Sequence, residues 1–392
     1  MQNIFRDSEF IFFFREYSAI FILNNRIISV TLLDDKGKIM EHSEVFLQRL
    51  GLRYPIIQAP MAGVSTPELA AAVSEAGGLG SLGLGASSVP QAKALIEKTN
   101  ALTDKPFNVN VFCHSTPVRN REIEQAWIHY FAQQLAQFNV LPPQQLNQVY
   151  TSFLDDPHML ALLLEMRPAV VSFHFNIPDK QVIDQLKAQG IYTMATATCL
   201  REAQLIEQAG IDAIIAQGIE AGGHRGMFDV NAEDEAITTF HLVELLVKNS
   251  QLPIIAAGGL MDGQEIKTAL EQGAVAAQLG TAFILCPESA ANEGYRHKLK
   301  SQNAADTALT AAISGRPARG IVNQFIRMTQ ADDCPAIPDY PIAYDLGKQL
   351  HAAASKMGSD DFAAHWAGQN ALKAREMPAS VLVETLVSEM TK

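Results

Sequence analysis

Residues 253–281, PIIAAGGLMDGQEIKTALEQGAVAAQLGT, contain two short apolar runs separated by a helical pattern. The runs at 253–257 and 275–279 are almost wholly apolar, as strands buried on both faces tend to be. Between them, Asp262 is the predicted N-cap of a helix and Gly273 its predicted end. A strand, a crossover helix and a second strand predict a parallel βαβ unit.

The same alternation extends back towards the N-terminus. Further apolar runs, each followed by turn residues and a helical pattern, occupy 55–59, 79–84, 107–112, 169–175, 191–195 and 213–217. The resulting eight strands, alternating with helices, predict an α/β fold of the (β/α)8 TIM barrel type. An open, doubly wound sheet is the alternative, because an edge strand can be miscounted.

Three segments outside this alternation predict the domain organisation. Residues 1–43 predict an N-terminal extension outside a barrel spanning 44–290, with an extra hairpin or an interfacial anchor as alternatives. Residues 117–167 predict a helical insertion after the third strand, with two helices around 141–143, and residues 291–392 predict a helical C-terminal region. Because barrel sites lie at the carboxyl ends of the strands, both helical segments are predicted to cover that face as a lid or second domain.

The composition excludes several classes of protein. With 392 residues, 48% hydrophobic and 18% charged, the chain is neither disordered nor collagenous. A net charge of −12 argues against a nucleic-acid partner. The four cysteines lack metal-ligand spacing, and no apolar stretch is long enough to span a bilayer. Both observations favour a reduced cytoplasmic protein without a metal. We expect it to be a monomer or a homodimer. The N-terminal flanks lack a basic region and a cleavage site, so no signal peptide is expected.

Glycines follow the last two predicted strands. Gly258 and Gly259 end one of them, and Gly280 and Thr281 follow the other. Bare main-chain amides at these two loops of a barrel commonly bind a phosphate group. The phosphate of FMN would suit this place. The alternative is that the glycines only turn each strand into the next helix.

A flavin ring over the barrel mouth would need polar groups from the other strand ends. Asn110 and Gln217 end two strands, and their amides can donate and accept at the pyrimidine edge of a flavin. The segment 58–63 follows the first strand, and Met61 there could pack on the ring. Core packing is the alternative for Met61, and bonding to loop backbone is the alternative for the two amides.

His224 lies between glycines directly after the sixth strand. Gly222, Gly223 and Gly226 let the backbone pass close to a ligand, and histidine titrates near neutral pH, so His224 is predicted to be functional. Its neighbour Arg225 either attracts an anionic substrate or pairs with Glu220. His174 and His114 are weaker candidates, with packing as the alternative.

Tyr340, Tyr344 and Lys348 are spaced by four residues in the C-terminal region. A helix would place them on one face, where two phenols and an ammonium could orient an anion. A solvated helix face is the alternative.

Together these motifs resemble the nitronate monooxygenase family, once called 2-nitropropane dioxygenases, and within it the bacterial class I type. The resemblance covers most of residues 50–350, and residues 1–39 have no match. The segments that carry it are QAPMAGV (58–64), AGGLGSLG (76–83), NVNVF (108–112), VVSFHF (170–175), QGIEAGGHRG (217–226), AAGG (256–259) and QLGTAFILCPE (278–288).

The resemblance implies an FMN-binding barrel with His224 as the active-site histidine. It also implies a substrate pocket of Tyr150, Tyr340, Tyr344 and Lys348. With the loops described above, the predicted cofactor-binding residues are Gln58, Pro60, Met61, Ala62, Asn110, Gln217, Gly222, Gly223, Gly258, Gly259, Gln278, Leu279, Gly280 and Thr281.

The implied reaction is oxidative denitrification of an alkyl nitronate by O2, giving a carbonyl compound and nitrite through a flavin semiquinone and a substrate radical. Propionate 3-nitronate, a toxin, is the implied substrate, with Lys348 or Arg225 near its carboxylate. His224 would supply a hydrogen bond or positive charge, or act as a base towards a neutral nitroalkane. One alternative is an FMN-dependent, NAD(P)H-using enoyl-ACP or quinone reductase on the same barrel. Another is a phosphate-binding barrel without a flavin.

Overall fold

Eight parallel strands form the centre of the molecule in the computed structural model, which describes residues 13–15, 18–23, 26–31 and 35–392, with side chains from residue 43 onward. Their order is β4-β12-β11-β9-β8-β7-β6-β5, and a parallel bridge between Ile57 and Leu79 joins the two outer strands into a ring. The predicted barrel is therefore confirmed, and the open sheet is wrong. The strands are β4 (Ile56–Gln58), β5 (Gly80–Gly83), β6 (Phe107–Phe112), β7 (Val170–His174), β8 (Tyr192–Ala197), β9 (Ala213–Gln217), β11 (Ile254–Ala257) and β12 (Ala276–Leu279).

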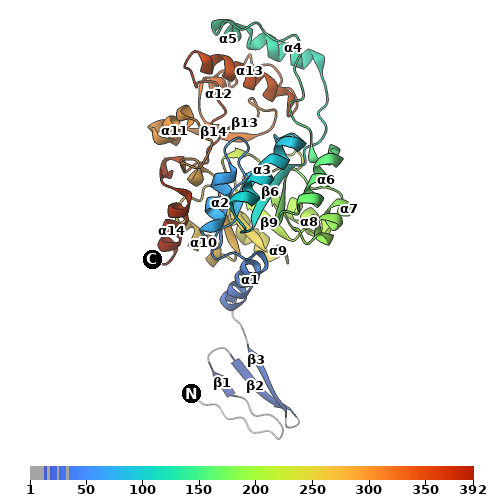
Figure 1. The fold of residues 1–392 in the computed structure, drawn as a ribbon, viewed down its shortest axis with the longest axis vertical. Helices are drawn as coiled ribbons and strands as arrows, with labels where there is room; N and C mark the ends of the chain where they lie inside the picture. Colours follow the sequence, from blue (N-terminus) through green and yellow to red (C-terminus); the bar gives the residue numbers. More distant parts are fainter. Residues whose placement is uncertain (1–12, 16–17, 24–25, 32–34) are drawn as a thin grey trace.

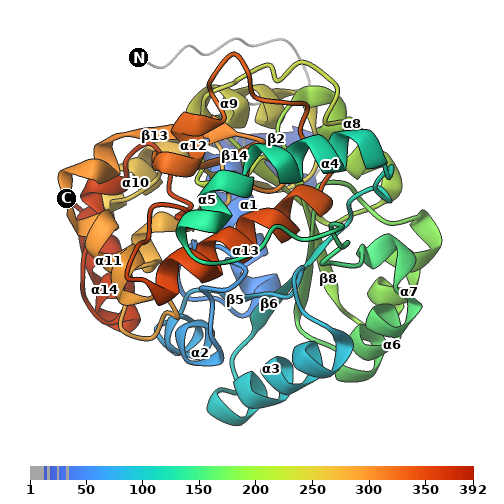
Figure 2. The same ribbon diagram turned by 90° about the horizontal axis from the view of Figure 1, so that it is seen from above.

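A ring of helices surrounds these strands (Figures 1 and 2). The local signals of the sequence explain their ends: Asp262 forms a capping box with Glu265 at the start of α10, and Gly273 follows its end with φ of +102°. The ring consists of α2 (Pro67–Glu75), α3 (Val89–Leu102), α6 (Pro157–Met166), α7 (Lys180–Ala188), α8 (Leu200–Ala209), α9 (Thr239–Asn249), α10 (Gly263–Glu271) and α14 (Ala379–Met390). The last of these helices comes from the C-terminal region, so that region contributes to the barrel wall as well as to its cover.

The amino end of the barrel is closed by α1 (Asp35–Leu50). Phe46 and Leu50 are buried in one apolar cluster with residues of the barrel interior, and the Ser43 hydroxyl donates to the Val275 carbonyl at 3.0 Å. Among the described residues, strands β1 (Phe13–Arg15), β2 (Ser18–Leu23) and β3 (Arg26–Thr31) pair only with one another, in an antiparallel sheet. That residues 1–43 lie outside the barrel as a separate extension stays a prediction, and part of that segment lies outside the described residues.

A helical layer stands over the carboxyl ends of the strands (Figure 1). It has its own apolar core, in which Trp127 and Phe131 of the insertion pack with Phe325 and Leu346 of the C-terminal region. Asp345 accepts hydrogen bonds from the backbone and side chain of Asn147, at 2.7 and 3.0 Å. The elements of this layer are α4 (Arg121–Tyr130), α5 (Ala132–Gln137), α11 (Glu293–Lys300), β13 (Thr307–Thr310), β14 (Ala318–Ile321), α12 (Gln324–Met328) and α13 (Ile342–Lys356). Two segments far apart in the sequence therefore form one cover over the barrel mouth.

Candidate active site

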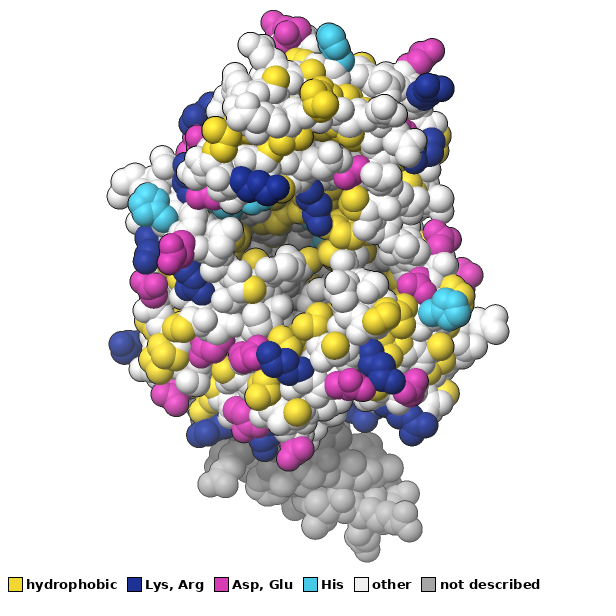
Figure 3. Space-filling view, turned by 45° about the horizontal axis from the view of Figure 1, so that its top comes forward, with side chains coloured by type: hydrophobic (Ala, Val, Ile, Leu, Met, Phe, Trp, Pro, Cys, Tyr) yellow, Lys and Arg dark blue, Asp and Glu magenta, His cyan; other side chains and the backbone are white. Residues whose placement is uncertain are grey.

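A cavity of about 950 Å³ lies between the carboxyl ends of the strands and the helical layer. Figure 3 shows its opening as a hollow between the barrel and the cover. Its volume is typical of sites for cofactors or drug-sized molecules. The predicted residues that line it are Pro60, Met61, Ala62, Asn110, Tyr150, Gln217, Gly222, Gly223, His224, Gly258, Gly259, Gln278, Gly280, Thr281, Tyr340, Tyr344 and Lys348.

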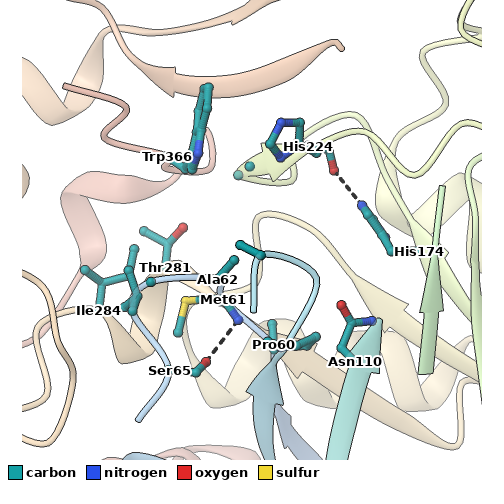
Figure 4. Close-up of a pocket in the computed structure, with 18 of the residues that line it drawn as sticks. Pro60, Met61, Ala62, Ser65, Asn110, His174, His224, Thr281, Ile284 and Trp366 are labelled. Carbon is teal, nitrogen blue, oxygen red and sulfur yellow. Dashed lines mark hydrogen bonds between the residues drawn. The ribbon is translucent and has the colours of Figure 1, made fainter. Parts of the chain in front are cut away.

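Two predicted cofactor residues lie behind the cavity wall. Gln58 is fully buried, its Oε1 accepts the Ser81 N–H at 2.8 Å, and its Nε2 donates to the Ser65 hydroxyl at 2.9 Å. Leu279 belongs to the apolar core. Neither side chain can contact a ligand directly, because strand alternation turns the two side chains away from the cavity. Gln58 instead holds the loop that carries Met61, whose N–H donates to Ser65 (Figure 4).

Three loops that line the cavity have backbone amides without a partner in the described chain. Within the described part of the chain, no hydrogen bond uses the N–H of Gly222, Gly259 or Thr281. Gly259 has φ of +70°, and a Cβ at Gly222 would lie 2.5 Å from the N atom of Gly368. Both positions therefore require glycine. Unpaired amides at glycine loops can bind an anion such as a phosphate group.

Side-chain amides of two strands face the middle of the cavity. Gln217 accepts the Gly226 N–H at its Oε1 and donates to the His224 carbonyl from its Nε2, at 2.8 and 3.0 Å, so one Nε2 hydrogen remains for a ligand. Asn110 donates to the backbone carbonyl and the hydroxyl of Ser172, which leaves its Oδ1 as an acceptor. The pair thus offers one donor and one acceptor, which matches the pyrimidine edge proposed from the sequence.

Arg225 does not enter the cavity, and both interpretations of it from the sequence are wrong. Its guanidinium is 1% exposed and binds the Asp234 carboxylate at 2.8 and 2.9 Å. It also donates to the Gln217 carbonyl at 2.9 Å. Glu220 accepts instead from the backbone and hydroxyl of Thr239. Arg225 therefore holds the loop of His224 rather than a substrate.

The imidazole of His224 stands at the cavity wall, and the residue is held through its backbone and through one ring nitrogen. Its residue pairs with Ala318 through the short strand β10 (Gly223–His224), and its Nε2 lies 2.9 Å from the Ser314 hydroxyl. Burial, together with the nearby His174 and Arg316, lowers the pKa of His224 to about 3. His224 is therefore neutral at physiological pH.

His174 supports His224 from below (Figure 4). Its Nε2 donates to the His224 carbonyl at 3.1 Å, and its Nδ1 lies 3.0 Å from the Thr196 hydroxyl. Burial lowers its pKa to about 4. Since both ring nitrogens are engaged, His174 positions His224 although it lines the cavity. His114 is also buried and lies outside the lining, with its ring 4.9 Å from that of Tyr340.

The helical layer brings three aromatic rings and one ammonium to the cavity. Lys348 Nζ lies 4.7 Å from the ring centre of Tyr150 and 5.4 Å from that of Tyr344. The rings of Tyr340 and Tyr344 lie 5.6 and 6.2 Å from that of His224. Burial raises the pKa of Tyr150 and of Tyr344 to about 12, so both phenols keep their protons and can donate. The solvated-face alternative is wrong for Tyr340 and Tyr344, whereas Lys348 is exposed; Tyr340 precedes α13, so one helix does not carry all three residues.

Some lining residues were absent from the sequence prediction. Trp366 lies with its ring 5.3 Å from that of His224, and Gly368 donates its N–H to Thr281 Oγ1 at 3.0 Å. Both lie in a segment without secondary-structure periodicity that returns from the cover to the barrel. Phe112 and Thr196 are strand-end residues that their position could have indicated. Among the described side chains, no group of three or more His, Cys, Asp or Glu could hold a metal ion.

Fold and site together define an α/β-barrel enzyme with unpaired amides, a neutral histidine and a tyrosine–lysine cluster, formed by Tyr150, Tyr340, Tyr344 and Lys348, around one cavity. The family model described as nitronate monooxygenase matches residues 44–389. A nitronate monooxygenase of Pseudomonas aeruginosa is 53% identical over 345 residues, which cover 88% of this chain and 98% of that protein. One of Paraburkholderia phytofirmans is 52% identical over 359 residues, which cover 92% and 97%.

Solved structures agree with these sequence relatives. A nitroalkane oxidase from Streptomyces ansochromogenes has a TM-score of 0.80 at 41% identity, and the match covers 88% of this chain and 97% of that one. The chain belongs to the nitronate monooxygenase family, as its motifs predicted. No helix in the described part of the chain is long and apolar enough to cross a membrane.

Proposed function

We propose that this protein binds FMN and uses O2 to denitrify alkyl nitronates, releasing a carbonyl compound and nitrite. The observation that carries the proposal is the set of unpaired amides at Gly222, Gly259 and Thr281 in the same cavity as the imidazole of His224. Membership of the nitronate monooxygenase family supports it.

The residues present fit FMN at both of its polar ends. The three amides suit its phosphate, and Gln217 and Asn110 suit its pyrimidine edge. Gln278 Oε1 is buried without a partner in the described chain, which leaves it as a further acceptor. Pro60, Met61, Ala62, Gly223, Gly258 and Gly280 complete the wall that would enclose it. When bound, FMN supplies the one-electron chemistry with substrate and O2.

The protein's own groups would bind and orient the nitronate anion. Lys348 is a cation, and the protonated phenols of Tyr150, Tyr340 and Tyr344 can donate to the nitronate oxygens. Donors in a water-poor cavity stabilise such an anion more strongly than they do in bulk water. The carboxylate of propionate 3-nitronate suits Lys348, which supports this compound as the substrate.

His224 would need to take a proton only from a neutral nitroalkane. A pKa of about 3 makes its imidazole a weak base, so we propose that nitronates are used in preference to neutral nitroalkanes. Towards a nitronate, His224 would then act as a neutral polar group that lines the pocket.

The proposal extends to the organisation of the chain. Residues 44–290 would bind the cofactor, the insertion and residues 291–392 would complete the substrate pocket, and residues 1–43 would lie outside both. Cysteines 113, 199, 286 and 334 are free, which supports the proposed cytoplasmic setting. A nitronate and O2 are the proposed partners, with the protein a monomer or a homodimer.

Two measurements test this function. Purified protein should be yellow and should release FMN on heating, and an oxygen electrode should record uptake with a nitronate in the absence of NAD(P)H. A colourless protein that takes up no FMN contradicts the cofactor. Steady NAD(P)H consumption without nitronate-dependent oxygen uptake favours the reductase instead.

A further inference from the structure

Ser314 contacts the active-site histidine from outside the cavity. It lies in the loop between β13 and β14, its side chain is fully buried, and its Oγ lies 2.9 Å from His224 Nε2. Its hydroxyl therefore acts on the imidazole and not on a ligand.

The hydrogen bonds around Ser314 Oγ decide which of its two neighbours receives the hydroxyl proton. Oγ accepts the Arg316 N–H at 3.3 Å, and it lies 3.1 Å from the Arg316 carbonyl, to which it can donate. A hydroxyl has a single proton to donate. If that proton goes to the Arg316 carbonyl, His224 must donate its own Nε2–H to Oγ, and every one of these buried groups is paired. If it goes to His224 instead, the Arg316 carbonyl loses the one hydrogen bond it has in the described chain. The first arrangement is favoured, because buried polar groups are rarely left unpaired.

The other ring nitrogen of His224 is then bare. Nδ1 makes no hydrogen bond to the described residues, and His224 lines the cavity, so Nδ1 is the ring atom left for a ligand. The position of the Ser314 hydroxyl is fixed, because the loop that carries it is tightly packed. Gly315 has φ of +95°, and a Cβ there would lie 2.3 Å from the Tyr340 N atom. The same loop accepts the Arg225 N–H at the Pro317 carbonyl, at 2.8 Å.

A fixed positive charge in this loop, that of Arg316, disfavours a second proton on the ring of His224. The Arg316 guanidinium lies with its central carbon 4.3 Å from the ring centre of Phe175 and is 5% exposed. Its Nε has no partner in the described chain. A doubly protonated His224 would add a second buried cation beside it.

We propose that Ser314 is a positioning residue that holds His224 as the Nε2–H tautomer and so presents Nδ1 to the cavity as a hydrogen-bond acceptor. This inference rests on the proposed function only in taking His224 as the active-site histidine. Its chemical consequence is that His224 and the tyrosine–lysine cluster bind different atoms of the ligands. Nitronate oxygens accept hydrogen bonds, so their donors are Lys348 and the tyrosines, whereas Nδ1 faces a group that carries a hydrogen.

The test is the tautomer itself, read by NMR in the full-length protein as isolated and labelled with [15N]histidine. Two-bond 1H–15N correlation spectra distinguish a bare Nδ1 from a bare Nε2, and the signals of His224 are those lost in His224→Asn. We expect protonated Nε2 in the wild type, the same pattern in Ser314→Thr, and loss of the preference in Ser314→Ala. Loss of one hydrogen bond should lower kcat/KM about tenfold in Ser314→Ala with FMN content unchanged.

A wild-type spectrum with protonated Nδ1 overturns the inference, and so does an unchanged tautomer in Ser314→Ala. The wild-type spectrum decides this even if the alanine variant does not fold. It does not depend on nitronate turnover, so failure of the proposed reaction would be seen separately.

Discussion

Replacing Lys348 by methionine removes the one cation of the tyrosine–lysine cluster while keeping a long apolar side chain. Lys348 Nζ lies near the ring centres of Tyr150 and Tyr344, at 4.7 and 5.4 Å. If this ammonium binds the carboxylate of propionate 3-nitronate, its loss should affect that substrate and leave an uncharged alkyl nitronate almost unaffected.

The size of the expected loss of binding energy follows from the surroundings of the Lys348 ammonium. A fully exposed ion pair contributes at most about 1 kcal/mol. Two charges 4 Å apart near a protein surface interact by about 4 kcal/mol before solvent screening. Lys348 is an exposed residue, but two phenol rings cover part of its head group, so we expect about 1–2 kcal/mol. That corresponds to a fall of about five- to thirtyfold in kcat/KM for the carboxylate substrate.

The assay is oxygen uptake with propionate 3-nitronate and with an alkyl nitronate of the same chain length without the carboxylate. The ratio of the two kcat/KM values should fall in Lys348→Met, and the wild-type ratio should decrease as salt is added. Lys356→Met is the matched control, because Lys356 is exposed on the same helix and lies outside the cavity. Equal losses on both substrates, or an unchanged ratio, would refute a role for Lys348 in carboxylate recognition.

Four further predictions concern the cofactor, the histidines and the core. Gly259→Val should reduce the FMN retained on purification, because valine is strained at φ of +70° and its Cβ would lie 2.8 Å from that of Glu220; full flavin content by absorbance would contradict the phosphate site. His224→Asn should keep its FMN but lose most nitronate turnover, because asparagine does not fill the place of the imidazole in the wall of the pocket, and undiminished turnover would exclude a role for His224 in the site. The free energy of unfolding should fall as pH decreases from about 6.5 towards 4. The reason is that burial lowers the pKa of His114 to about 4 in the folded protein, so this histidine takes up its proton only on unfolding. Urea melts should show a smaller fall in His114→Phe, and an equal fall would exclude His114 as a source of the pH dependence. Phe46→Ala should destabilise the protein by about 3–5 kcal/mol, measured by urea unfolding, whereas a change under 1 kcal/mol would show that α1 does not close the barrel.

Local sequence signals were sufficient to predict those strands, caps and turns that depend on residues close together in the chain. The apolar runs at 253–257 and 275–279 became β11 and β12, and Asp262 became the cap of α10. Gly259 adopts the positive φ that its place after a strand suggested. Such features depend on contacts within a few residues, which a single sequence contains.

Partners distant along the chain could not be predicted in the same way. Arg225 binds Asp234 rather than Glu220, because the loop turns its side chain under the strand ends instead of towards the cavity. Gln58 faces Ser81 behind the wall although its neighbours in sequence line the site. A shift of one residue at a strand end reverses the side of the sheet to which a side chain points, and only the folded barrel determines it.

The sequence by itself therefore determined the barrel, the glycines that line the cavity and the identity of His224 as the candidate histidine. Only the tertiary structure decided how His224 is held, since Ser314, His174 and Trp366 approach it from three separate parts of the chain. The physical reason is that strand and turn preferences act between near neighbours, whereas a buried imidazole obtains its hydrogen bonds from whichever groups the completed fold brings within about 3 Å of it.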